Sequence, residues 1–95
     1  MSGEAMVEHD RAKSRFVIRL EGREAFLSYR QEGTELDLQH TFVPDAFRGR
    51  GLAERLCQAA FEHAKAGHLT VIPTCPYISG AYLKRHPEHL SLVKA

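Results

Sequence analysis

The sequence predicts an α/β fold, a compact and mostly antiparallel mixed sheet with two helices, forming one domain over residues 7–95. Two observations lead to this prediction. Apolar residues alternate before Pro44 and recur at helical spacing after Gly51, so strands precede a helix. A short β-branched run and a second helical segment starting at Pro76 then follow. Residues 1–6 are small and polar, and we expect them to be disordered.

Three antiparallel strands are expected before Pro44. The segments "FVIRL" (16–20) and "AFLSYR" (25–30) flank "EGRE", a glycine-containing connection typical of a hairpin. A second turn, "QEGT", leads into "ELDLQHTFV" (35–43), where apolar and polar residues alternate. Alternation predicts that one face of this third strand carries Leu36, Leu38, His40 and Phe42.

The segment after these strands predicts a helix over residues 51–66, because its apolar residues recur three or four positions apart. Cys57 lies on the apolar face and is expected to be a small buried hydrophobe. Gly67 suits the position just past the end of a helix.

The C-terminal part is expected to hold one strand and one helix. "LTVIP" (69–73) has the composition of a central strand covered on both faces, and a crossover makes it parallel to residues 35–43. Pro76 suits the first position of a shorter helix, which Pro87 ends. The tail "LSLV" either adds a last strand or packs against the rest.

Composition excludes several classes of protein. With 13 basic and 12 acidic residues the net charge is +1, so no overall field favours nucleic acid or an acidic membrane. No apolar run approaches the roughly 20 residues of a membrane span, and the N-terminus lacks the apolar core of a secretory signal. We therefore expect a cytoplasmic protein. Cys57 and Cys75 form neither a disulfide framework nor a metal quartet, and "HPEH" lacks a complementary ligand pair, so no metal is expected.

The seam "VPDAFRGRGLAERL" (43–56) has the chemistry of an anion site. Glycines let backbone N–H groups approach a ligand, and the start of a helix adds unpaired donors and a partial positive charge. Together with two arginines these features suit a phosphate. A sharp turn with solvated arginines is the alternative, and the two interpretations are about equally supported by the physics of the loop alone.

The same residues carry a resemblance to a known family. Arg48, Gly51 and Ala53 match the R/Q-x-x-G-x-G/A pyrophosphate signature of the GNAT superfamily of N-acetyltransferases, which use acetyl-coenzyme A (acetyl-CoA). The stretches "HTFVPDAFRGRGLAERL" and "VIPTCPYISGAYLKRHPEH" resemble a subfamily of short stand-alone GNAT proteins, over about residues 7–93.

The resemblance implies a binding mode for acetyl-CoA. In GNAT proteins two parallel strands splay apart and the pantetheine arm lies between them, here between residues 36–43 and 69–73, with Pro44 marking where the sheet opens. Phe42 and Val43 would then face the pantetheine through their backbone. The pyrophosphate would be held by Arg48, Gly49, Arg50, Gly51, Leu52 and Ala53.

Three residues are candidates for catalysis. His40, near the end of its strand, has the chemistry of a general base, and its alternative is a partly buried structural histidine. Tyr82 matches the general-acid tyrosine of many GNAT enzymes, and its alternative is a core tyrosine. Cys75 precedes Pro76 at the start of a helix, where the positive pole stabilises a thiolate, so it either accepts the acetyl group or only lines the pocket.

The chain departs from the family pattern at its N-terminal side. A full GNAT domain begins with an additional strand and two helices that build the acceptor side of the cleft, and 95 residues leave no room for them. We therefore expect an acceptor site that is open or completed by a partner. The acceptor is an amine, on a small molecule or a protein; the alternative function is a coenzyme A-binding or interaction module with little turnover. The sequence does not determine the oligomeric state.

Overall fold

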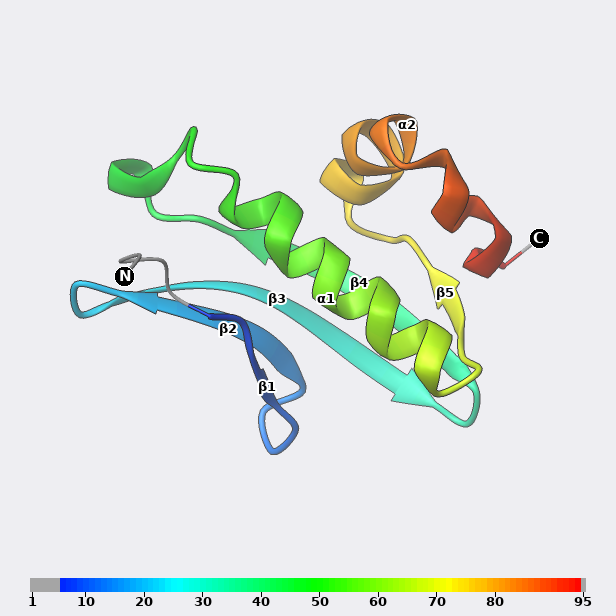
Figure 1. Cartoon of the computed structure of the whole chain (residues 1–95). Helices are drawn as coiled ribbons and strands as arrows, with labels where there is room; N and C mark the ends of the chain where they lie inside the picture. The colour runs from blue at the N-terminus through cyan, green and yellow to red at the C-terminus, as the bar shows by residue number, and fades with distance from the viewer. Residues whose placement is uncertain (1–5, 95) are drawn as a thin grey trace.

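The computed structural model describes residues 6–94, in which a five-stranded sheet is combined with helical segments (Figure 1). The expectation of disorder concerns residues 1–6, of which only Met6 lies within the described part. The elements are β1 (Glu8–Asp10), β2 (Arg15–Leu20), β3 (Arg23–Glu32), β4 (Glu35–Phe42), η1 (Asp45–Phe47), α1 (Leu52–Ala66), β5 (Thr70–Ile72), η2 (Ile78–Tyr82), α2 (Leu83–Arg85) and η3 (Pro87–Leu92). Within residues 6–94, no helix has both the length and the apolar character that crossing a membrane requires.

The strands lie in chain order, β1-β2-β3-β4-β5, and every neighbouring pair is antiparallel except β4 and β5. The predicted hairpin, third strand and parallel fourth strand are therefore confirmed. Two residues with positive φ, Glu21 (52°) and Gly22 (77°), form the β2–β3 turn, which is the geometry that matches the strand twist. The prediction that residues 69–73 form a central strand was wrong, because β5 lies at the edge of the sheet.

One extra residue in β4 changes which side chains face the core. Ser28 pairs with His40 and Tyr29 with Leu38, which leaves Gln39 as the additional residue of a β-bulge. Beyond the bulge the alternation is reversed, so Thr41 lies opposite the buried Leu27. The predicted common face was therefore wrong in part: Leu36 and Leu38 are buried, whereas His40 and Phe42 lie on the opposite face, beside Phe26.

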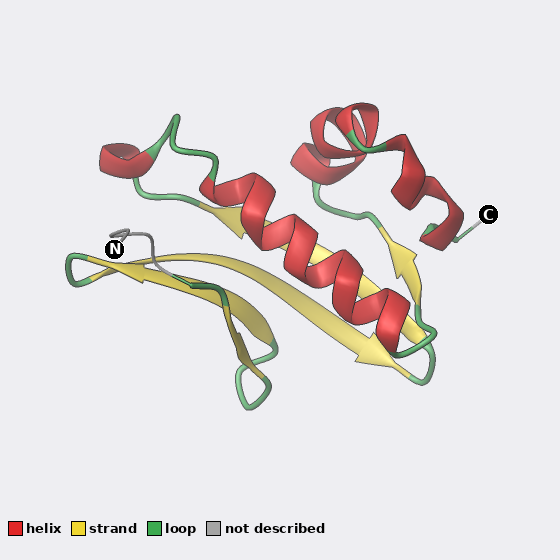
Figure 2. Ribbon diagram, viewed as in Figure 1, coloured by secondary structure: helices red, strands yellow, loops and turns green. Residues whose placement is uncertain are grey.

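Helix α1 covers one face of the sheet, and Figure 2 shows the helical segments gathered on that side. Its apolar stripe, Cys57 included, is fully or almost fully buried, as the helical periodicity predicted. The sheet contributes alternate residues of β2, β3, β4 and β5 to the same core. The largest side chains that are completely enclosed are Tyr82, Phe61, Ile18, Leu27, Leu36, Leu38 and Leu56.

The described part of the chain has one additional strand, β1, ahead of β2, so the expectation that there is no room for such a strand was wrong. β1 pairs antiparallel with β2 after a turn over residues 11–14, so the two helices of a full GNAT domain are absent from this connection. His9 anchors β1: its ring stacks on Phe16 at 4.2 Å, its Nε2 lies 2.7 Å from the Tyr29 hydroxyl, and His63 of α1 contacts it edge-on at 4.6 Å.

The C-terminal part is helical over residues 76–85, as Pro76 and Pro87 predicted, and five of its residues form a π-helical turn, η2. After η3 the chain returns to the edge of the sheet. There Val93 forms a single bridge with Val71, and the Lys94 amide donates to the Val71 carbonyl at 2.8 Å. The tail therefore packs along β5 without forming a full strand.

Candidate acyl-CoA site

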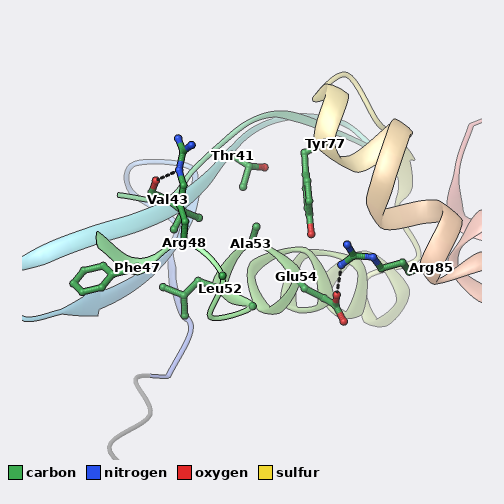
Figure 3. A pocket seen from close by; sticks show the side chains of 11 residues that line it. Thr41, Val43, Phe47, Arg48, Leu52, Ala53, Glu54, Tyr77 and Arg85 are labelled. Carbon is green, nitrogen blue, oxygen red and sulfur yellow. Dashed lines mark hydrogen bonds and ion pairs between the residues drawn. The ribbon is translucent and has the colours of Figure 1, made fainter. Parts of the chain in front are cut away.

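A cavity of about 360 Å³ lies where the end of β4, the start of α1 and the helical segment 76–85 meet (Figure 3). Its walls combine backbone-rich glycine positions with apolar and charged side chains. The lining residues are Thr41, Val43, Phe47, Arg48, Gly49, Gly51, Leu52, Ala53, Glu54, Tyr77 and Arg85. Six of the eight predicted cofactor-binding residues are among them, and Phe42 and Arg50 are the two that are not.

The glycines of the seam adopt the conformations expected of an anion loop. Gly49 and Gly51 have φ of 84° and 76°, in the left-handed region that other residues rarely adopt. Gly51 is the N-cap of α1, and no side chain caps the helix there. The first intrahelical bond runs from the Arg55 amide to the Gly51 carbonyl at 3.1 Å, so the amides of residues 52–54 have no partner within the helix. These donors and the positive end of the helix dipole lie at the cavity.

The two arginines of the seam have different surroundings. Arg48 stands at the rim of the cavity, where its Nε donates to the Val43 carbonyl at 3.4 Å and lies 3.1 Å from Asp45. Its side chain is 69% exposed, so it can turn toward a ligand. The Arg50 guanidinium instead lies over the Phe47 ring, 5.1 Å from its centroid. Arg48 is therefore the better placed of the two to contact an anion.

The parallel strand pair separates next to this cavity. Pairing of β4 with β5 ends at Asp37 and Ile72, and one further bond joins the Cys75 amide to the Leu38 carbonyl at 2.9 Å. Residues 40–42 pair only with β3 among the strands of the described chain. The strands do splay, but the opening begins beyond Leu38, so Pro44 does not mark it.

Cys75 lies at the start of the second helical segment, as predicted. Its carbonyl accepts hydrogen bonds from the amides of Ile78 (3.0 Å) and Ser79 (3.1 Å). Its thiol is 3.4 Å from the hydroxyl of Thr41, which lines the cavity. Only 4% of Cys75 is exposed, so the thiol sits directly behind the cavity wall.

The structure does not bring His40 and Tyr82 to the cavity. His40 is exposed on the face of the sheet opposite α1, next to Phe26. Tyr82 is fully buried, stacks on Phe61 and on His86, and its hydroxyl lies 3.0 Å from Nδ1 of His89. Burial raises the pKa of Tyr82. The core interpretation of Tyr82 is the one that matches its position.

Five cavity residues were missed by the sequence analysis, and three of them, Tyr77, Glu54 and Arg85, carry ionisable groups. Tyr77 points into the cavity from the first turn of the segment 76–85, and burial raises its pKa (Figure 3). Glu54 in α1 accepts a bond from Arg85 at 3.1 Å and lies 3.1 Å from Nε2 of His86. These two partners, His86 first, lower the pKa of Glu54. "P-x-C-P-Y" contains Tyr77, so that motif was the available signal.

Within residues 6–94, no group of three or more histidine, cysteine, aspartate or glutamate side chains is arranged to hold a metal ion. The cavity lining itself offers acid–base side chains and backbone donors.

The sequence and the fold are both similar to known proteins. Residues 15–92 match the family model described as GCN5-related N-acetyl-transferase. Proteins named NATD1 are similar along most of their length: that of Xenopus tropicalis is 45% identical over 89 residues, covering 90% of this chain and 81% of the relative. The Homo sapiens protein is 45% identical over 84 residues, with 85% and 74% covered.

A solved structure has the same fold. The solution structure of a GCN5-like protein from Staphylococcus aureus superposes with a TM-score of 0.75 at 23% identity, covering 99% of this chain and 92% of that one. At this identity the likeness shows the fold alone. Family model, relatives and fold agree, and the chain belongs to the GCN5-related N-acetyl-transferase family, whose GNAT fold the sequence analysis expected.

Proposed function

We propose that the protein binds acetyl-CoA in this cavity and transfers its acetyl group to an amine. One observation carries the proposal: a single cavity connects the uncapped start of α1 to the place where β4 and β5 separate. The first feature suits a pyrophosphate and the second an extended arm that hydrogen-bonds to backbone. Acetyl-CoA has both a pyrophosphate and an extended pantetheine arm, and membership of an acetyltransferase family supports it as the ligand.

The cofactor is assigned to residues as follows. Amides of residues 52–54 and the loop from Gly49 to Gly51 receive the pyrophosphate, and Arg48 adds a charge-assisted contact. The pantetheine lies along the unpaired edge of β4, with Val43 at the cavity end. The acetyl thioester then reaches the region of Thr41 and Cys75.

Direct transfer requires an amine nitrogen to attack the thioester carbonyl carbon. The C–S bond breaks, the coenzyme leaves as a thiolate, and the ammonium loses its proton to solvent water. Tyr77 is the tyrosine that lines the cavity, so we assign protonation of the thiolate to Tyr77 and not to the buried Tyr82. His40 faces away from the cavity, and we assign it no proton transfer.

A covalent route through Cys75 is the alternative chemistry. Its thiolate would attack the acetyl carbonyl, release coenzyme A and then pass the acetyl group to the amine. The thiol lies 3.4 Å behind the Thr41 hydroxyl, so a small movement of Thr41 gives it access. Mass spectrometry after rapid quenching with acetyl-CoA tests this route: an acetyl adduct on Cys75 that C75S lacks supports it, and its absence with turnover intact removes it.

A second candidate is a coenzyme A-binding or protein-interaction module with little turnover. It is favoured by the short connection between β1 and β2, which leaves the acceptor side without the two helices of a full domain. The same opening admits a large acceptor such as a protein amine as well as a small one. We place the protein in the cytoplasm and treat residues 7–95 as one domain on the sequence arguments alone.

Amide NMR during titration with acetyl-CoA tests binding. We expect the largest shifts at residues 41–54 and 75–77, and much smaller shifts with R48A at the same ligand concentration. An unchanged spectrum at ligand concentrations of about 1 mM, the weak end of specific binding, contradicts the proposal. Release of free thiol with a panel of small amines and peptides then separates the two candidates, because a binding module responds in the titration but releases none.

A further inference from the structure

Arg85 brings a second cation to the cavity from outside the glycine loop. It lies at the end of α2, 37 positions after Arg48, yet both arginines line the same cavity. In Figure 3 Arg48 and Arg85 stand at opposite ends of the cavity, with the start of α1 between them. An anion on the first amides of α1 therefore lies between two guanidinium groups.

A π-helical turn sets the direction of Arg85. Tyr77 and Arg85 are eight positions apart, and a regular α-helix advances about 100° per residue, which would separate them by about 80° around the axis. The π turn over Ile78–Tyr82 accommodates roughly one extra residue, about 100°, and so leaves them within about 20° of each other. Both side chains consequently line the cavity.

Glu54 holds the Arg85 side chain beside the helix start. Its carboxylate, in the first turn of α1, accepts from Nη1 of Arg85 at 3.1 Å, and 63% of the arginine side chain is exposed. A guanidinium has five N–H donors in a planar fork, so this bond leaves donors for a ligand. Unneutralised, the Glu54 carboxylate would repel a phosphate at this place. Arg85 pairs with it and offsets its charge, and His86 contacts its other oxygen.

We propose that Arg85, directed by the π turn and held by Glu54, is a second contact for a phosphate group of the coenzyme, facing Arg48 across the start of α1. The inference rests on the proposed function, since it requires that coenzyme A binds in the cavity. Two phosphate positions have the same chemistry, the pyrophosphate and the 3′-phosphate of the ribose. Measurements with two ligands distinguish them.

The test is calorimetric titration of wild type, R85A and K84A with coenzyme A and with dephospho-coenzyme A, which lacks the 3′-phosphate. Lys84 is the matched control, because it is an exposed cation next to Arg85 that does not line the cavity. We expect R85A to weaken coenzyme A binding by about tenfold or more, the range of a charge-assisted hydrogen bond, and K84A by about twofold or less.

The ligand comparison assigns the phosphate. If the loss in R85A disappears with dephospho-coenzyme A, Arg85 contacts the 3′-phosphate; if it persists, Arg85 contacts the pyrophosphate. Equal affinities of R85A and K84A for both ligands overturn the inference while the proposed function stands. Absence of binding by the wild type overturns both.

A deletion checks the role of the π turn independently. Removing Gly80, whose position has no neighbouring atom within 4 Å of an added Cβ, restores regular α-helical register and turns Arg85 away from the cavity. We expect this variant, once circular dichroism shows that it is folded, to bind coenzyme A as weakly as R85A. If it is folded and binds like wild type, the π turn does not direct Arg85.

Discussion

Replacing Gly51 by alanine tests whether backbone conformation, and not space, requires glycine at the start of α1. Gly51 has φ of 76°, and a Cβ built there meets no atom within 4 Å. A steric clash is therefore excluded as a cause of instability. Gly80 provides the matched substitution, because it also has open space around an added Cβ but lies in the helical segment without a positive φ.

The two substitutions are expected to change stability in opposite directions. At Gly51 the left-handed backbone costs an L-residue about 1–2 kcal/mol, and the less flexible unfolded chain returns about 0.4–1 kcal/mol. The net loss is about 1 kcal/mol, or about 4–8 °C in Tm for a domain of this size. At Gly80 alanine is the better helix former and raises the free energy of unfolding by as much as about 1 kcal/mol.

Urea unfolding followed by circular dichroism measures both changes, and titration with coenzyme A measures their effect on the site. G51A should unfold at lower urea and bind more weakly, since strain at the N-cap redirects the amides of α1. G51N should recover part of the stability, because asparagine tolerates this conformation better. If G51A and G80A shift the urea midpoint in the same direction, the conformational explanation of the loop is wrong.

Three further predictions concern stability. E21N should raise the free energy of unfolding by up to about 1 kcal/mol in thermal or urea unfolding, because Glu21 has φ of 52° in a two-residue turn that prefers asparagine before glycine. Burial and the nearby His63 lower the pKa of His9 from 6.5, and burial also lowers the pKa of His63. The unfolded chain therefore binds these protons more readily, so the stability is complete above about pH 6.5 and falls as the pH drops below it. H63F should make the urea midpoint depend less on pH between about pH 7.5 and about pH 5.5. Y82F should lose the bond to His89 and about 1 kcal/mol of stability while keeping its affinity for coenzyme A; a loss of affinity in a fully folded Y82F would return Tyr82 to the site.

Periodicity predicted the elements whose side chains alternate regularly between core and solvent. Strand β3, the first part of β4 and helix α1 have such patterns, whereas β5 was predicted from its apolar composition and the crossover before it. β1 is short, and the three residues "EHD" have no apolar alternation; its anchor is the histidine contact with Phe16 and Tyr29. No local pattern indicates such a strand.

The site was predictable where backbone chemistry defines it and was not where side-chain direction defines it. Glycines before a helix indicated the loop at Gly49 and Gly51 correctly. Whether Tyr77 or Tyr82 lines the cavity depends on how the helical segment 76–85 is rotated relative to the cavity. The spacing of residues in the sequence does not determine this rotation. Likewise Glu54 and Arg85 are joined only by tertiary packing.

The bulge at Gln39 shifts the register between β4 and β3 by one residue. The orientation of every β4 side chain after the bulge depends on this one inserted residue. If β4 ran through Gln39 without a bulge, Gln39 would pair with Ser28 and His40 with Leu27, so an imidazole would take the place beside Cys75 that the Thr41 hydroxyl now occupies. The inserted residue therefore places a small hydroxyl, and not a ring, in front of the thiol.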